Sequence, residues 1–85
     1  MAVELRPDVT LTPTGSGAVV LDERSGRYFQ LNRTGLHILR SLLDGRTAEE
    51  IATDLSERYP VTAAQVHTDI DALRDSLRTA GLVSG

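Results

Sequence analysis

The stretch from Leu21 to Gly35 constrains the fold of this chain more than any other part of the sequence. It reads Leu-Asp-Glu-Arg-Ser-Gly-Arg-Tyr-Phe-Gln-Leu-Asn-Arg-Thr-Gly. Gly26 closes a turn between two β-prone segments, and Asn32 is a favourable residue for starting a helix directly after the second one. The segment Arg27–Leu31 has apolar side chains on both faces of the strand it would form, so this strand needs more cover than a surface hairpin provides.

Two further segments complete a predicted sheet. Val9–Pro13 alternates apolar and polar residues, and Pro13 stands at its end, where a missing N–H is tolerated. Ala18–Asp22 is apolar and β-branched, and it follows a glycine-rich turn. We expect Arg27–Leu31 to pair antiparallel to Ala18–Asp22.

The second half of the chain has helix signals. The first predicted helix covers Arg33–Asp44, and Gly45 is its stop signal. Thr47 and Glu50 have the spacing of a capping box and open a second helix, which Pro60 ends.

A third and longer helix begins after Thr62 and ends near Ala80–Gly81. Its apolar stripe consists of Val66, Ile70, Leu73 and Leu77. Leu82–Val83 could then return to the core. The sequence therefore predicts a single α+β domain over residues 1–85, winged helix-turn-helix-like, with a three-stranded antiparallel sheet followed by three helices (βββααα).

Composition excludes several classes of function. The chain has 85 residues and no cysteine, so thiolate catalysis, disulfides and cysteine-ligated metals are absent. Its N-terminal region is charged and lacks a long apolar run, which favours a cytoplasmic protein without a membrane segment. We predict no enzyme activity and no cofactor, because no catalytic motif is present.

One candidate metal site lies on the third helix, where His67, Asp71 and Asp75 follow one another at four-residue steps. Arg74 and Arg78 come three residues after the two acids, which is typical of a solvated, salt-bridged helix face. No further His or Cys completes a ligand set. We therefore predict no metal.

A DNA-reading winged helix has the same order of elements. The third helix, however, carries Asp69, Asp71 and Asp75 against only two arginines, and the chain has a net charge of −3. Phosphate would be repelled, so a DNA-binding regulator is the weaker alternative and we predict no nucleic-acid partner.

Peptide binding agrees better with the residues. Phe29 and Leu31 share one face of their strand and are expected to face the core, while Tyr28 and Gln30 share the other. An uncovered strand edge offers unpaired N–H and C=O groups to an incoming strand. Arg27 opens this strand.

One flank of the third helix offers a second wall for such a peptide. Asp69, Leu73, Ser76 and Ala80 lie along it, and apart from the acid they are small or apolar. Pockets between strand and helix would then give specificity. The alternative is that Ser76 and Ala80 only pack against the domain's own strands.

The order and spacing of these segments resemble a PqqD-like protein, the small winged-helix fold also called a RiPP recognition element. The resemblance covers roughly residues 5–83. It is carried by Val20–Asp22, Tyr28–Asn32, Thr34–Gly35, Leu42–Gly45, Thr47–Ile51, Asp69–Ile70, Leu73 and Gly81–Leu82. One departure is Leu39, where many relatives have a Trp.

Within this family the chain most resembles the stand-alone leader-binding proteins of lasso-peptide pathways. The resemblance implies that the leader of a ribosomally made precursor adds as a strand to Arg27–Leu31 and lies against Asp69, Leu73 and Ser76. It also implies presentation to a separate leader-cleaving cysteine protease, followed by an ATP-dependent cyclase. The alternative within the fold is a PqqD-type peptide chaperone for a radical-SAM enzyme.

Overall fold

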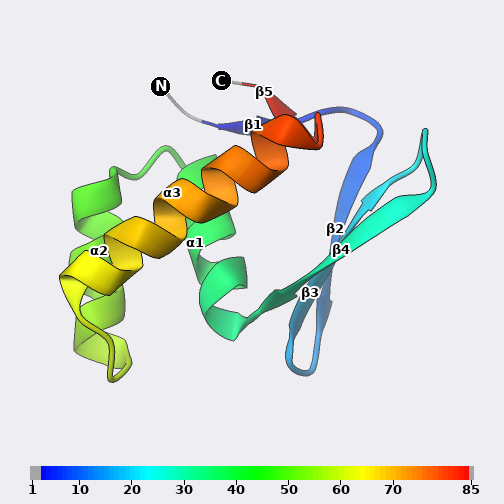
Figure 1. The fold of residues 1–85 in the computed structure, drawn as a ribbon. Helices are drawn as coiled ribbons and strands as arrows, with labels where there is room; N and C mark the ends of the chain where they lie inside the picture. Colours follow the sequence, from blue (N-terminus) through cyan, green and yellow to red (C-terminus); the bar gives the residue numbers. More distant parts are fainter. Residues whose placement is uncertain (1–2, 85) are drawn as a thin grey trace.

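A computed structural model describes residues 3–84 and shows a sheet with three helices on one of its faces (Figure 1). The strands and helices follow one another along the chain as β1 (Glu4–Leu5), β2 (Val9–Thr14), β3 (Gly17–Asp22), β4 (Arg27–Asn32), α1 (Arg33–Leu43), α2 (Ala48–Arg58), α3 (Ala63–Thr79) and β5 (Val83–Ser84). The predicted α+β class, with a three-stranded antiparallel sheet followed by three helices, is confirmed.

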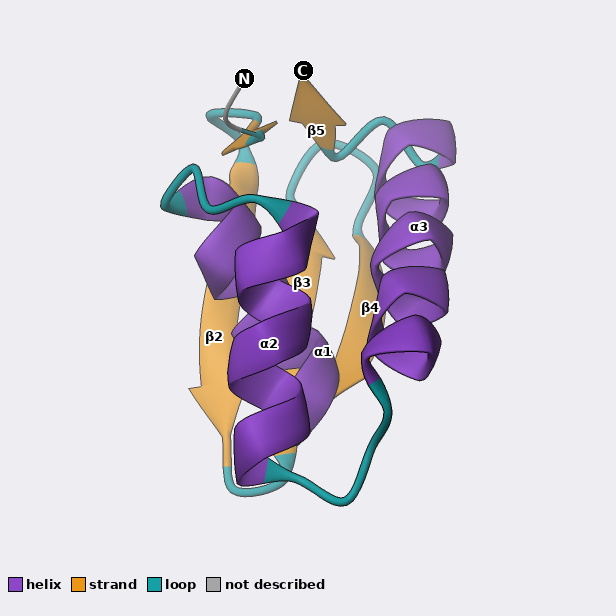
Figure 2. Cartoon of the chain, turned by 90° about the vertical axis from the view of Figure 1, so that its left-hand side faces the viewer, coloured by secondary structure: helices purple, strands orange, loops and turns teal. Residues whose placement is uncertain are grey.

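The main sheet has the order β2-β3-β4, and both of its pairs are antiparallel. β2 and β3 are joined by a two-residue turn that closes on the pair Thr14 and Gly17. β3 and β4 close on the pair Asp22 and Arg27. β2 and β4 are therefore the two edges of this sheet, and Figure 2 shows them on opposite sides of β3.

The hairpin turn before β4 is held by the carboxylate of Asp22. This carboxylate accepts hydrogen bonds from the Ser25 hydroxyl at 2.9 Å and from the Arg24 amide at 3.1 Å. The Ser25 hydroxyl is the main reason that the pKa of Asp22 lies below its ordinary value. The Ser25 oxygen also accepts a hydrogen bond from the Arg27 amide, which fixes the start of β4.

Each long helix begins at the residue that the sequence indicates. The Asn32 side chain accepts a hydrogen bond from the Gly35 amide at 2.8 Å, so α1 starts where β4 ends. Thr47 and Glu50 form the predicted reciprocal capping box at the start of α2. Thr62 caps α3 by accepting from the amide of Gln65.

Two groups of buried side chains hold the layers together. The first joins the helices and includes Ile38, Leu42, Ile51, Leu55, Val66 and Ile70. The second lies between the sheet and the helices and consists of Val9, Val20, Leu39, Leu77 and Leu82. Leu39 is fully buried in this second group.

The ends of the described chain form a small sheet that the sequence did not predict. β1 pairs antiparallel with β5, with Leu5 opposite Val83. The amide of Arg6 also donates to the Leu82 carbonyl at 3.0 Å. The predicted return of Leu82 to the core is confirmed, because its side chain is buried in the second group.

Candidate peptide-binding surface

Among residues 3–84, β4 has a strand neighbour on one side only, which is β3. In an antiparallel ladder alternate residues bond to a given neighbour. The two-residue turn makes Thr14 and Gly17 a hydrogen-bonded pair, so the backbone of Gly17 bonds to β2. The next residue, Ala18, and every second residue after it therefore bond to β4, where their partners are Leu31, Phe29 and Arg27. It follows that the backbone N–H and C=O groups of Tyr28 and Gln30 face the open edge.

The side chains that β4 points toward the helices meet the predicted helical wall. Phe29 and Leu31 pack, partly buried, against the core group between sheet and helices. Leu73 of α3 packs against the same group and is also only partly buried. The predicted core-facing orientation of Phe29 and Leu31 is thereby confirmed. α3 runs along the side of the molecule on which β4 is the edge (Figures 1 and 2).

Tyr28 and Gln30 lie on the opposite face of the sheet, which no helix of the described chain covers (Figure 1). Tyr28 is 64 % exposed and is paired with Leu21 of β3, while Gln30 is paired with Val19. Tyr28 and Gln30 can contribute their backbone groups to a bound strand without their side chains entering the core.

The other predicted binding residues are solvent-exposed. Arg27 begins β4, and Asp69 and Ser76 lie one turn from Leu73 on either side along α3. The structure therefore brings Phe29, Leu31 and Leu73 together and leaves these three polar residues at the surface. We call the eight residues the β4–α3 surface: Arg27, Tyr28, Phe29, Gln30, Leu31, Asp69, Leu73 and Ser76. Their roles in binding remain predictions.

Three surface cavities differ in how they relate to the β4–α3 surface. One of about 310 Å3 includes Gln30 and Leu31, together with residues of β3 and the β2–β3 turn. Two others, of about 610 and 410 Å3, are lined by α1 and α2 and the segments beside them. None of these three has a residue of α3 in its lining.

A polar cluster between α1 and α2 was not predicted. Nε2 of His37 lies 2.7 Å from Oδ2 of Asp54, whose other oxygen accepts a hydrogen bond from Arg58 at 2.9 Å. Partial burial acts to raise the pKa of Asp54, but the hydrogen bonds from His37 and Arg58 outweigh it, and the pKa is lowered. The cluster therefore ties the two helices together, and His37 has a structural partner.

The α3 face that carries His67, Asp71 and Asp75 shows no metal-ligand set in the described part of the chain. Among residues 3–84, no three His, Asp or Glu side chains are grouped closely enough to hold an ion. Of the two ion pairs expected there, Arg78 approaches Asp75 at 3.9 Å. The expected pair of Asp71 with Arg74 is not formed within 4.0 Å in this described helix, so that expectation was wrong for one of the two acids.

Comparisons with known proteins identify the family of this chain. Residues 17–83 match the family described as coenzyme PQQ synthesis protein D (PqqD). The chain belongs to the PqqD family. The predicted resemblance to a PqqD-like RiPP recognition element is confirmed by this match and by two solved structures.

The PqqD-family chain is similar over its whole length to a lasso peptide synthetase B1 complexed with the leader peptide. The two share 38 % sequence identity over 100 % of both chains, with a TM-score of 0.89. A second similar structure is TbiB1 in complex with the TbiA(beta) leader peptide, with 26 % identity, 96 % and 95 % coverage and a TM-score of 0.80. No curated protein matches. Within the described part of this chain, no helix has the length and apolar character needed to span a membrane.

Proposed function

We propose that this PqqD-family protein is an adaptor that binds the leader of a ribosomally made precursor peptide in lasso-peptide maturation. The observation that carries this proposal is the 38 % identity, over the full length of both chains, with a lasso peptide synthetase B1 complexed with its leader peptide. The leader-bound TbiB1 structure supports it independently. We place the adaptor in the cytoplasm, where precursors are synthesised.

The proposed binding mode is addition of the leader as a fourth strand beside β4. The backbone groups of Tyr28 and Gln30 would pair with it, since they face the open edge of the sheet. Each such hydrogen bond contributes only about 0.5–1.5 kcal/mol net. Apolar side chains of the leader must therefore supply much of the affinity, by covering the partly exposed Phe29, Leu31 and Leu73.

The adaptor is proposed to be non-catalytic and to hand the bound leader to other proteins. A separate leader-cleaving cysteine protease would cut the presented precursor, and an ATP-dependent cyclase would then close the ring. This division of labour fits a small chain whose side chains form a structural cluster at His37 and Asp54 and a partly apolar surface at β4 and α3.

The test is a titration of the 15N-labelled protein with the leader of the precursor encoded beside it. Amide shifts are expected to concentrate on Arg27–Leu31 and around Asp69–Ser76. A scrambled leader of the same composition is the control, and it should give no saturable shifts. If the native leader causes no shifts at high excess, leader binding by this protein is wrong for that precursor.

The family match to coenzyme PQQ synthesis protein D favours a second candidate, a peptide chaperone for a radical-SAM enzyme. The genetic neighbourhood separates the two: an iron–sulfur enzyme beside the gene supports the chaperone, and a small cysteine protease supports the lasso-peptide adaptor. Co-purification with the neighbouring enzyme then checks the assignment. Salt-dependent binding of random duplex DNA would instead favour the winged-helix regulator.

A further inference from the structure

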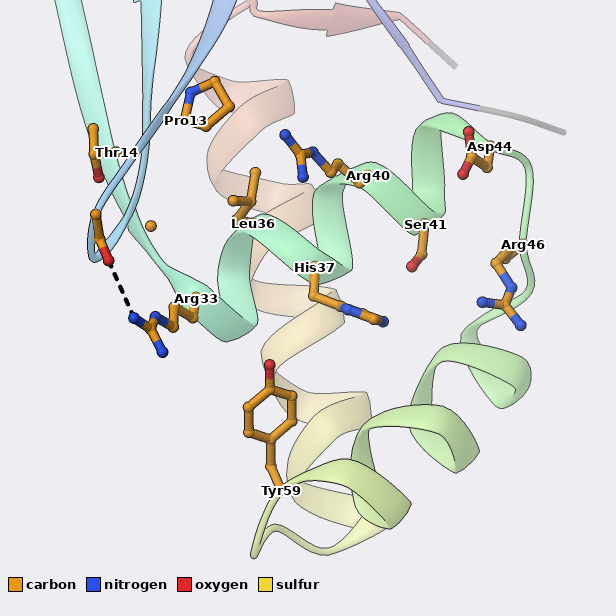
Figure 3. A pocket seen from close by; sticks show the side chains of 12 residues that line it. Pro13, Thr14, Arg33, Leu36, His37, Arg40, Ser41, Asp44, Arg46 and Tyr59 are labelled. Atoms are coloured by element: carbon orange, nitrogen blue, oxygen red, sulfur yellow. Dashed lines mark hydrogen bonds between the residues drawn. The ribbon is translucent and has the colours of Figure 1, made fainter.

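The cavity that adjoins the end of β2 lies at the sheet edge opposite β4. It has a volume of about 610 Å3, within the range typical of ligand sites. Its walls are the end of β2 with the β2–β3 turn, the outer face of α1, the start of the α1–α2 connection, and Tyr59 after α2 (Figure 3). We call it the α1 pocket.

The α1 pocket is basic although the chain is acidic. Arg33, Arg40 and Arg46 line it, and Asp44 is the one acid in its lining. With His37 counted as neutral, these residues give a local charge of +2 on a protein with a net charge of −3. Figure 3 shows the three arginines arranged around Leu36 and His37. The charge of this pocket is therefore opposite to that of the protein as a whole.

The arginines keep donor groups available to a ligand. Within residues 3–84, Arg40 has no carboxylate within 4.0 Å, and its side chain is exposed. Arg33 uses one nitrogen to donate to the Gly15 carbonyl at 3.2 Å, which also fixes its direction across the pocket. Arg46 reaches Asp54 only at 4.0 Å, whereas His37 and Arg58 each bond one oxygen of that carboxylate, at 2.7 and 2.9 Å.

The pocket also has an apolar component. Leu36 is partly buried, and Pro13 and Tyr59 lie on either side of it in the lining. Arginines combined with apolar side chains suit a ligand that places a carboxylate next to an aliphatic group. An acidic protein segment with alternating apolar residues has this chemistry.

Nucleic acid fits less well, because the neighbouring surface is acidic. Arg46 is shared with a hollow lined by Glu49, Glu50, Asp54 and Glu57 of α2. A polyphosphate backbone passing from the α1 pocket along α2 would meet these carboxylates, whereas a short peptide segment need not extend over them.

We propose that the α1 pocket is a docking site for a carboxylate-bearing segment of a partner protein. Its lining shares no residue with the β4–α3 surface, so both sites can be occupied at once. The proposal does not depend on leader binding, since it rests on the charge and shape of the pocket alone. If the leader adaptor is correct, this site provides the contact through which a processing enzyme is held beside the bound precursor.

The test uses the full chain, labelled with 15N, and a blocked peptide acetyl-Leu-Glu-Leu-Glu-Leu-amide as the probe. Saturable shifts are expected at Leu36–Ser41 and Tyr59, with a Kd on the order of 1 mM for so short a segment. The matched peptide acetyl-Leu-Gln-Leu-Gln-Leu-amide has the same shape without the charges, and we expect it to bind about tenfold more weakly.

Substitutions assign the binding to this pocket. Arg40→Gln should weaken the acidic peptide about tenfold, because it removes a charged donor. Arg78→Gln is the control: Arg78 is an exposed arginine of α3 outside the pocket, and its loss should leave the affinity unchanged. Thermal unfolding of both variants checks that the fold is retained.

Four results would overturn the proposal. The first two are equal affinities of the glutamate and glutamine peptides, and equal losses of peptide affinity in Arg40→Gln and Arg78→Gln. The third is the absence of shifts at millimolar peptide. The fourth is displacement of the peptide by inorganic phosphate or duplex DNA at a concentration lower than that of the peptide. The last result would reassign the pocket to small anions or nucleic acid.

Discussion

The α1–α2 junction and the β4–α3 surface differ in how completely their bonding groups are used. At the junction, both oxygens of Asp54 are occupied by His37 and Arg58, and the Thr47–Glu50 capping box satisfies the start of α2. At β4, the backbone groups of alternate residues face an open edge, and three apolar side chains remain partly exposed.

This difference distinguishes structural from binding chemistry in a small protein. A His–Asp pair first suggests catalysis, but here it joins two helices and has an Arg as its third member.

An unpaired strand edge favours aggregation unless something covers it. β2 is the other edge of the sheet. Pro13 stands at a position of β2 where the backbone N–H would face outward, so this edge lacks one hydrogen-bond donor. β4 has no proline, and its edge is the better template for an added strand.

The largest effect is expected for Gly17→Ala, which would disrupt the position of β4 itself. A Cβ added to Gly17 would lie 1.8 Å from the carbonyl oxygen of Leu31, a backbone atom that moves only if β4 moves. We expect a loss of about 3 kcal/mol in the free energy of unfolding, measured by urea denaturation. Gly15→Ala, in the same turn with no atom within 4 Å of its added Cβ, should change stability by less than about 0.5 kcal/mol. Equal stability of the two variants would show that β4 is not held by this close approach.

Leu73→Asp tests the binding side of the comparison. A charge on the apolar wall of α3 should reduce leader affinity by at least about a hundredfold, because a buried carboxylate is strongly unfavourable. Fluorescence anisotropy with labelled leader measures this effect.

Leu73 also packs against the core, so Leu73→Asp can unfold the domain. Leu73→Ala and Leu73→Met keep the test decisive. The first should weaken binding about tenfold, and the second, which conserves volume, should bind nearly as the native protein does. If a folded Leu73→Ala variant binds the leader with native affinity, the leader does not contact α3 at Leu73.

Gln30→Pro has a smaller expected effect, because it removes a single donor from the open edge. The N–H of Gln30 faces away from β3, so proline leaves the β3–β4 ladder intact. Leader affinity should fall about tenfold in a calorimetric titration, corresponding to one lost hydrogen bond and local misfit of the added strand. Gln30→Ala retains the N–H and is the matched control with near-native affinity. A leader that binds both variants equally does not pair with this edge.

The sequence predicted the parts of the fold that rest on local chemistry. Asn32, Thr47 and Thr62 cap helices because each can accept an amide hydrogen within its own first turn. The alternation in Arg27–Leu31 indicated which side chains face the core, and the order of strands indicated that β4 is an edge.

What the sequence did not indicate depends on contacts between distant residues. His37 and Asp54 are 17 positions apart on different helices, and only the packing of α1 on α2 brings them together. β1 and β5 are two-residue strands, too short to show a period of two. The α1 pocket likewise combines residues from β2, α1 and the end of α2, none of which forms a sequence motif.

The smallest predicted effect is an acid-dependent loss of stability at the α1–α2 junction. The pKa of Asp54 is lowered from 3.8 in the folded protein, so the folded state binds this proton more weakly than the unfolded chain does. The stability that Asp54 contributes is therefore fully present above pH 3.8 and is lost as the pH falls through the lowered folded-state pKa. Asp54→Asn should then destabilise the protein at neutral pH and make little difference in strong acid, as measured by urea unfolding across this range. Glu57→Gln, an exposed acid on the same helix, should show no such convergence. A constant difference between Asp54→Asn and the native protein at all pH values would mean that its hydrogen-bonding shape, rather than its charge, holds the two helices together.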